Sequence, residues 1–171
     1  LDRRQYQFTR TNGSGTSGDL STAGAKTITL TPCPIGMAVG ISVYLSGGVG
    51  TAEPVTLTGY TPGAGSCTIS FTSANTHTGT WSIRSTSGGI QEAVIEAGFY
   101  GGVDLGCGTI EVYAPIKVSY RVSLAGCGVD STYLHNNSTT TGVINYTALT
   151  PSADQDTFGG ATFSGFTIYS G

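Results

Sequence analysis

The sequence predicts an all-β protein with one short helix near its middle. Along most of the chain, runs of Thr, Val, Ile and Ser alternate with a period of two, and Gly or Pro interrupts them. Glycine provides 27 of the 171 residues, while charged residues provide only 10 %. This composition is typical of strands joined by tight turns beneath a neutral surface that is rich in hydroxyl groups. Only residues 85–98 show the apolar spacing of a helix.

Residues 1–25 predict an N-terminal arm followed by a linker of Gly, Ser and Thr. The run QYQFTR alternates like a strand, and the linker behind it leaves the run free to pair away from its own domain. Two interpretations stay open: a frayed terminus, or an arm that adds a strand to the sheet edge of a neighbouring chain. The residues of this assembly arm are Arg3, Arg4, Tyr6, Phe8 and Arg10.

Residues 26–84 predict a small antiparallel β module, either a sandwich or a barrel-like structure. Five short alternating runs lie within it, from AKTITLTPCP to GTWSIRSTSG. Trp81 has two interpretations, a core residue or a platform for stacking a sugar, and its alternating strand favours the core. The expected inward-facing residues are Ile28, Leu30, Val43, Leu45, Val55, Leu57, Ile69, Phe71, Trp81 and Ile83.

The segment STSGGIQEAVIEAG predicts the one helix. Ile90, Val94 and Ala97 fall on a single stripe, at the spacing of an amphipathic helix. Ser87 is a plausible cap, and Gly98 ends the helix. A helix of two to three turns is too short to be stable alone in water. We therefore expect it to cover an apolar surface, and strands resume after it.

The four cysteines predict two disulfide bonds, because no C-x-x-C pair accompanies the two histidines and a zinc site is poorly supported. Of the three possible pairings we favour Cys33–Cys67 with Cys107–Cys127, and free buried thiols are the alternative. Disulfides imply a secreted or cell-surface protein. No apolar run approaches the roughly 20 residues of a membrane helix. A net charge of −3 argues against nucleic-acid binding.

Residues 85–171 resemble the start of a right-handed parallel β-helix of the pectate-lyase superfamily, of the secreted bacterial type. The resemblance lies in the helix phrase IQEAV, the strand GTIEVY, the segment VSLAGCG, the phrase STYL and the final FSGFTIYSG. It implies that a capping helix, with Ile90, Val94 and Ala97 as the solenoid cap, precedes the first coils. Residues 26–84 resemble the small β module that precedes such helices.

The resemblance leaves two functions open. The first is an extracellular structural or binding protein that is not catalytic in these residues. It would self-assemble through the arm or the open solenoid end, as a fibre, appendage or tail-spike component. The alternative is the N-terminal portion of a secreted polysaccharide-degrading lyase or glycosidase. The expected partners are other copies of the chain or further coils of the same protein, with polysaccharide as a third candidate.

No catalytic residue and no cofactor site is predicted within this chain, because no set of nucleophile, histidine and acid is visible. Asp154 and Asp156 have the D-x-D spacing that could hold Ca²⁺, and a solvated loop is the alternative. Four sites match the sequence for N-linked glycans, namely Asn12, Asn136, Asn137 and Asn145.

Overall fold

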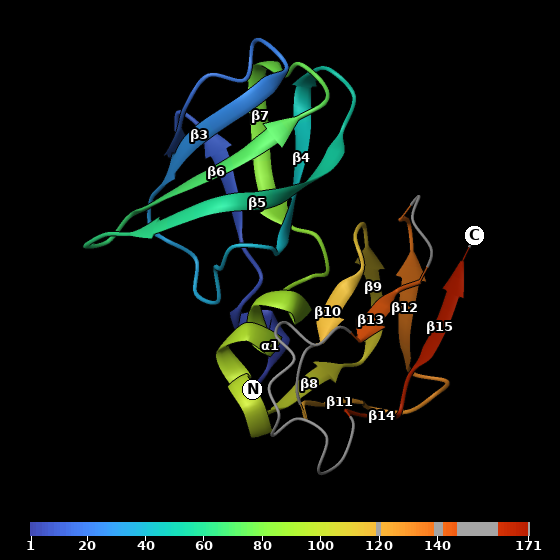
Figure 1. The fold of residues 1–171 in the computed structure, drawn as a ribbon. Coiled ribbons are helices and arrows are strands. Elements are labelled where there is room, and N and C mark those ends of the chain that lie inside the picture. Colours follow the sequence, from blue (N-terminus) through green and yellow to red (C-terminus); the bar gives the residue numbers. More distant parts are fainter. Residues whose placement is uncertain (119–120, 139–141, 147–160, 171) are drawn as a thin grey trace. The chain divides into compact units, whose positions relative to one another are not determined.

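The computed structural model describes residues 1–118, 121–138, 142–146 and 161–170 (Figure 1). Asp154 and Asp156, the predicted calcium ligands, lie outside the described residues. The elements are η1 (Arg3–Gln5), β1 (Thr9–Asn12), β2 (Gly15–Ser17), β3 (Gly24–Leu30), β4 (Ser42–Val49), β5 (Glu53–Pro62), β6 (Cys67–Ser73), β7 (Thr78–Ser85), α1 (Ile90–Ala97), η2 (Gly98–Tyr100), β8 (Gly102–Gly106), β9 (Gly108–Val112), β10 (Ile116–Val118), β11 (Ser123–Gly126), β12 (Thr132–Asn136), β13 (Ile144–Tyr146), β14 (Thr162–Ser164) and β15 (Thr167–Ser170).

The chain divides into two compact units. Unit 1 contains residues Leu1–Tyr6 and Ser87–Gly171, and unit 2 contains Gln7–Thr86. This division differs from the boundaries expected from the sequence, in which residues 1–25 stand apart as an arm. The difference arises because residues 9–17 form two strands of unit 2. Within the described residues, no helix has the length and apolar character needed to cross a membrane.

Unit 2 is a closed barrel, which is one of the two forms expected for this module. Its strand order is β1-β2-β3-β6-β5-β4-β7, and β7 pairs with β1 to close the circle (Figure 1). The β1–β2 pair is parallel, and the other pairs are antiparallel. Successive residues of a strand point to opposite faces, so the alternating apolar residues meet inside the barrel. All ten of the predicted inward residues are buried, with Trp81 among them.

A carboxylate fixes the loop between β6 and β7 to the start of β5. Glu53 is 8 % exposed. It accepts hydrogen bonds from the backbone N–H groups of Ala74 and Asn75, both at 2.8 Å. Its Oε1 also lies 3.2 Å from Nε2 of His77, whose side chain is fully buried. Glu53 therefore joins two backbone N–H groups of the loop and the buried imidazole of His77 to the start of β5.

Unit 1 consists of the helix α1 and three small parallel sheets. The sheets have the orders β14-β11-β8, β15-β12-β9 and β10-β13. Every pair in them is parallel. The buried core contains Ile90, Ala93, Val94, Val103, Leu105, Ile110, Val112, Ile116, Val118, Val122, Leu124, Leu134 and Val143.

The resemblance to the pectate-lyase superfamily is wrong, and the predicted right-handed parallel β-helix is not supported. The described residues form a closed barrel of seven strands and separate parallel sheets of two or three strands. A solenoid is stabilised by repeated units stacked on one another. Local phrases such as GTIEVY predict strands correctly, yet they do not specify how many units follow.

The predicted helix forms at the expected residues. Gly89 is its N-cap, and Ser87 contributes by accepting a hydrogen bond from Gln91 N at 3.0 Å. Gly98 has φ of 63°, which a residue with a side chain rarely adopts, and the helix ends there. Ile90 and Val94 are buried in the core of unit 1, and Ala97 packs against it. The helix thus covers the apolar interior of the small sheets, and not the end of a solenoid.

The side chain of Gln91 joins α1 to β10. Its Nε2 donates to Lys117 O at 3.1 Å, and Lys117 N donates to its Oε1 at 2.7 Å. A primary amide can satisfy a backbone donor and a backbone acceptor at once, as a neighbouring strand would. The Gln91 side chain therefore satisfies the backbone N–H and C=O groups of Lys117 in β10, which a neighbouring strand would otherwise satisfy.

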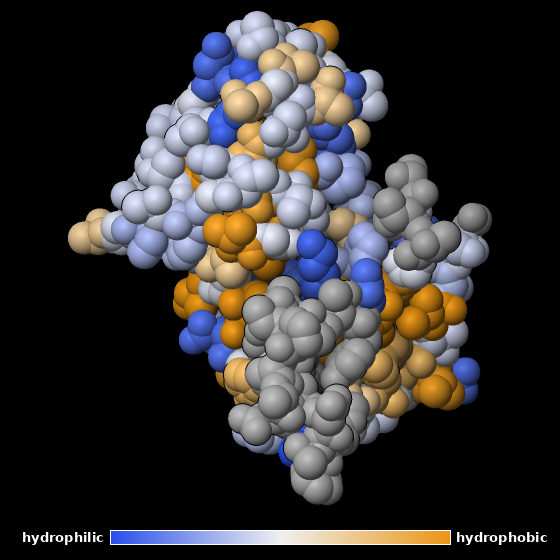
Figure 2. Space-filling model, in the orientation of Figure 1, coloured by the Kyte–Doolittle hydropathy of each residue, from blue (hydrophilic) through white to orange (hydrophobic). Residues whose placement is uncertain are grey.

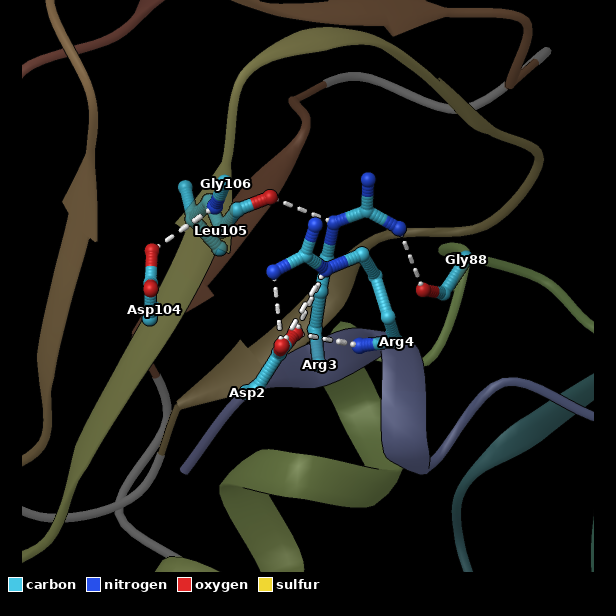
Figure 3. Close-up of polar contacts among 7 residues, drawn as sticks. All are labelled: Asp2, Arg3, Arg4, Gly88, Asp104, Leu105 and Gly106. Atoms are coloured by element: carbon cyan, nitrogen blue, oxygen red, sulfur yellow. Dashed lines mark hydrogen bonds and ion pairs between the residues drawn. The ribbon is translucent and has the colours of Figure 1, made fainter.

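The N-terminal segment Leu1–Tyr6 is part of unit 1 (Figure 3). Asp2 forms a parallel bridge with Asp104 of β8. The buried Arg3 donates from Nε to Leu105 O at 2.6 Å and from Nη1 to Gly88 O at 2.9 Å. Burial lowers the pKa of its guanidinium from the ordinary value. Arg3 thus ties the segment to two parts of unit 1.

The neighbouring Arg4 makes a different contact, which is exposed. It forms an ion pair with Asp2 at 2.7 Å (Figure 3). Hydrogen bonds from Arg4 lower the pKa of Asp2 to about 2. An exposed pair of this kind contributes little to stability.

Candidate functional site

The outer face of the sheet β15-β12-β9 concentrates aromatic and polar side chains. Alternation turns Ile110 and Leu134 inward to the core, so their neighbours in sequence point outward. The parallel register then aligns these outward residues in two rows. One row contains Thr109, Tyr133 and Thr167, and the other contains Glu111, His135 and Tyr169. We call this surface, together with Asn137, the tyrosine face.

A hollow of about 340 Å³ lies on the tyrosine face. Thr109, Tyr133, Thr167 and Tyr169 line it. The two threonines are small and flank Tyr133 in its row, and this leaves space beside the phenol ring. The volume is at the lower end of the range for small-molecule sites. The hollow is therefore large enough for one small ligand unit or for part of a chain.

Tyr169 is held by two neighbouring rings. The imidazole of His135 stacks on it, with centroids 4.6 Å apart and planes at 9°. Tyr133 meets it edge to face, with centroids 6.1 Å apart and planes at 82°. Offset and edge-to-face contacts are the preferred arrangements of aromatic pairs. These contacts fix the position of Tyr169, which is 39 % exposed.

Three polar side chains form a connected group beside the rings. His135 Nδ1 lies 2.8 Å from Glu111 Oε2, and Asn137 Nδ2 donates to the same oxygen. A carboxylate only accepts hydrogen bonds, so Nδ1 of His135 is the donor in this contact. In the neutral imidazole, Nε2 is then an acceptor. The pair Glu111–His135 consequently presents hydrogen-bond acceptors to a ligand.

The chemistry of the tyrosine face suits binding. Tyrosine offers an apolar ring and a polar hydroxyl, a combination that serves ligands with one apolar and one polar side. Within the described residues, no nucleophilic side chain is hydrogen-bonded to His135, whose recorded polar partner is Glu111. The described residues also contain no group of three or more His, Cys, Asp or Glu that could hold a metal ion.

Both disulfides expected from the sequence are present. Cys33 bonds to Cys67, and Cys107 bonds to Cys127. The first bond is in unit 2 and the second in unit 1. Two disulfides in an all-β chain are consistent with an oxidising extracellular environment.

The residues of the expected assembly arm are all engaged within their own chain. Arg3 and Arg4 make the contacts described above, and Tyr6 packs against the core of unit 1. Phe8 is buried in the barrel, where its N–H donates to Ser85 Oγ at 3.2 Å. Arg10 donates from Nε to Pro32 O at 3.0 Å. The segment therefore pairs with its own barrel and sheet, while a role between chains stays a prediction.

The four asparagines of the glycan sequons have different surroundings. Asn12 donates from its side chain to Gly79 O at 3.2 Å, and Asn137 donates to Glu111. Asn136 accepts from Ser138 N at 2.9 Å, and Asn145 is an exposed residue of β13. Their glycosylation stays a prediction.

Apart from Asn137, which was predicted as a glycan-acceptor site, the residues of the tyrosine face were not predicted as a site from the sequence. Tyr133, His135 and Tyr169 lie in strand-like runs separated by many residues, and only the parallel register brings them together. A usable signal does exist, since TIE, YLH and TIY each place an aliphatic residue between two polar or aromatic ones. Aligning these triplets would have placed the outward residues in neighbouring rows.

Comparisons with known proteins find no relative. No protein-family model matches the chain, no curated protein matches it, and no solved structure matches it. The resemblance expected from the sequence thus lacks support from a family match as well as from the topology.

Proposed function

We propose that this chain is an extracellular binding protein that holds a saccharide on the tyrosine face without altering it chemically. The observation that carries the proposal is the hollow beside Tyr133 and Tyr169, with acceptor groups of Glu111 and His135 in the adjoining row. A sugar ring has an apolar face of C–H groups and a rim of hydroxyls. The phenol rings suit the apolar face, and the acceptors suit the hydroxyls.

The character of the whole chain supports this proposal. Disulfides stabilise both units, as is common in proteins outside the cell. The site lies on strands, which hold side chains more rigidly than loops do. Tyr169 is already fixed by two rings before a ligand arrives, so little conformational freedom is lost on binding.

The substitution Tyr133→Ala tests the proposal. We expect the affinity for the bound oligosaccharide to fall by roughly tenfold to a hundredfold, since aromatic residues at the centre of a site contribute most of the binding energy. Isothermal titration calorimetry on the full chain, with a panel of oligosaccharides, measures the change. Tyr100→Ala is the matched control, because Tyr100 is 76 % exposed and lies in η2, outside the tyrosine face.

Two results would contradict the proposal. One is that no oligosaccharide of the panel binds to the wild-type chain. The other is that Tyr133→Ala binds as tightly as Tyr100→Ala does. A folded variant is required in each case, and the circular dichroism spectrum establishes this.

A second candidate function is self-association, favoured by a specific observation on β14 and β15. These are the outer strands of their sheets within the described residues. Phe163 pairs in register with Leu124, and Ile168 with Leu134. The leucines are fully buried, whereas Phe163 is 43 % and Ile168 is 47 % exposed. Figure 2 shows hydrophobic atoms at the surface on the side of the view where Figure 1 places β14 and β15.

Exposed strand edges beside apolar side chains are surfaces on which another chain can add a strand. On this hypothesis a second copy covers β14 and β15. Light scattering coupled to size-exclusion chromatography should then show dimers whose fraction rises with concentration. The double substitution Phe163→Ser with Ile168→Ser should abolish them, whereas Phe99→Ser, at another exposed phenylalanine, should not. A wild-type chain that is monomeric at every concentration would exclude this second function.

A further inference from the structure

We infer that the tyrosine face selects neutral or amino sugars and rejects sugars that carry a carboxylate. The inference rests on the proposed function and specifies its ligand class. It follows from the charge and the hydrogen-bonding capacity of the side chains beside the hollow.

With the imidazole of His135 neutral, the charge of the face is negative. Among the residues of β9, β12 and β15, Glu111 is the one acidic side chain, and these strands contain no Lys or Arg. Uronate recognition usually depends on Arg or Lys, which pair with a carboxylate. Here a uronate would instead meet Glu111, and two like charges close together repel each other.

The hydrogen-bonding groups of the tyrosine face also favour neutral or amino sugars over sugars that carry a carboxylate. Oε2 of Glu111 already accepts hydrogen bonds from His135 and Asn137. Oε1 of Glu111 is therefore available to accept from donor groups of a ligand. Nε2 of His135 and Oδ1 of Asn137 are acceptors as well when the imidazole is neutral. Among the described residues, none donates a hydrogen bond to these three atoms. A row of acceptors matches ligand groups that donate.

Hydroxyl and ammonium groups donate hydrogen bonds, whereas a carboxylate only accepts them. A neutral sugar can therefore satisfy the row with its hydroxyls, and an amino sugar adds an attraction to Glu111. A uronate carboxylate oriented toward the same row could form no hydrogen bond with these acceptors, and it would also be repelled by the charge of Glu111. The phenol groups of Tyr133 and Tyr169 can donate, but they carry no positive charge.

Matched pairs of oligosaccharides test this inference. The pairs are oligomers of glucose and glucuronate, of mannose and mannuronate, and of galactose and galacturonate, compared at equal chain length. Their rings differ in one exocyclic group, hydroxymethyl against carboxylate. For every pair that binds, we expect the neutral member to bind at least about tenfold more tightly at low salt. The difference should shrink at high salt, because salt screens exposed charges.

The substitution Glu111→Gln identifies the source of the selectivity. Glutamine has almost the same shape and keeps one acceptor oxygen, but it has no charge. We expect the ratio of neutral to acidic affinity to fall by about tenfold toward unity in this variant. Glu96→Gln is the matched control, because it makes the same change of charge on the exposed side of α1 and should leave the ratio unchanged.

The outcomes separate the inference from the proposed function. If the acidic members bind as tightly as the neutral ones, and Tyr133→Ala weakens both, the saccharide site stands and the inference is wrong. If the neutral members bind more tightly but Glu111→Gln leaves the ratio unchanged, the inference is wrong as well. If no oligosaccharide binds at all, the proposed function fails, and the inference fails with it.

Discussion

Replacing Glu53 by Ala should lower the free energy of unfolding of the barrel by about 3 kcal/mol, one of the largest effects expected in this chain. The carboxylate accepts from the N–H groups of Ala74 and Asn75 and contacts His77. Its removal takes away two hydrogen bonds from partly buried backbone N–H groups to a charged acceptor, together with the carboxylate beside the buried imidazole of His77. Hydrogen bonds to charged groups contribute about 1.5–3 kcal/mol each. Glu53→Gln should give a smaller loss, since the amide keeps one oxygen acceptor.

Fluorescence of the single tryptophan measures this effect. Trp81 is 2 % exposed and lies in β7 of the barrel, so its signal reports unfolding of that unit as urea is added. Glu96→Ala provides the control, because Glu96 is exposed and belongs to unit 1. An unfolding midpoint for Glu53→Ala equal to that of the control would show that the contacts of Glu53 do not stabilise the barrel.

Replacing Arg3 by Met should destabilise unit 1 by about 2–4 kcal/mol. Methionine fills a comparable volume but donates no hydrogen bond, so the carbonyl groups of Leu105 and Gly88 lose their partners. The N-terminal segment would then keep its backbone contacts with β8 and the packing of Tyr6 against the core of unit 1. Amide hydrogen exchange of residues 88–112 should accelerate by roughly 30-fold or more, which is the same free energy expressed as a rate.

The adjacent residue supplies the control for this second prediction. Arg4 is exposed and forms an ion pair with Asp2. Because an exposed ion pair contributes little to stability, Arg4→Met should leave the exchange rates close to those of the wild type. Equal acceleration in the two variants would mean that positive charge near β8 matters, and that the buried contacts of Arg3 do not. Unchanged rates in both would show that the contacts of Arg3 do not stabilise unit 1.

The residues of the barrel core were predictable because an alternating pattern of apolar residues is enough to show which side of each strand is buried. Ile28 and Leu30 in β3, or Ile69 and Phe71 in β6, occupy alternate positions, and a strand must turn such residues to one side. The helix stripe of Ile90 and Val94 follows from the same reasoning at a period of 3.6. The preference for Cys33–Cys67 was correct too.

The pairing of distant segments could not be predicted in the same way. Strands β1 and β2 close the barrel, although the polar composition of residues 11–17 indicates a linker, because strand pairing satisfies backbone groups whatever the side chains are. Arg3 has the appearance of a surface charge, and only the backbone carbonyl groups around it make its burial favourable. The tyrosine face likewise depends on the register among β9, β12 and β15.

The resemblance to a solenoid family failed for a related physical reason. Short phrases of strand and turn residues report local preference, and several architectures use the same local structure. A solenoid differs from a set of small sheets in the number of stacked repeats. A short sequence phrase does not specify how many repeats follow it. The topology of the described residues shows a closed barrel and separate sheets of two or three strands.

The most direct test of the saccharide site is a nuclear magnetic resonance titration of the isotope-labelled full chain with the oligosaccharide that binds most tightly in calorimetry. We predict that the largest shifts belong to residues of the tyrosine face, with the barrel unaffected. The residues concerned are Thr109, Glu111, Tyr133, His135, Asn137, Thr167 and Tyr169. Saturable shifts confined to the barrel, or to α1, would contradict the account and place the ligand elsewhere.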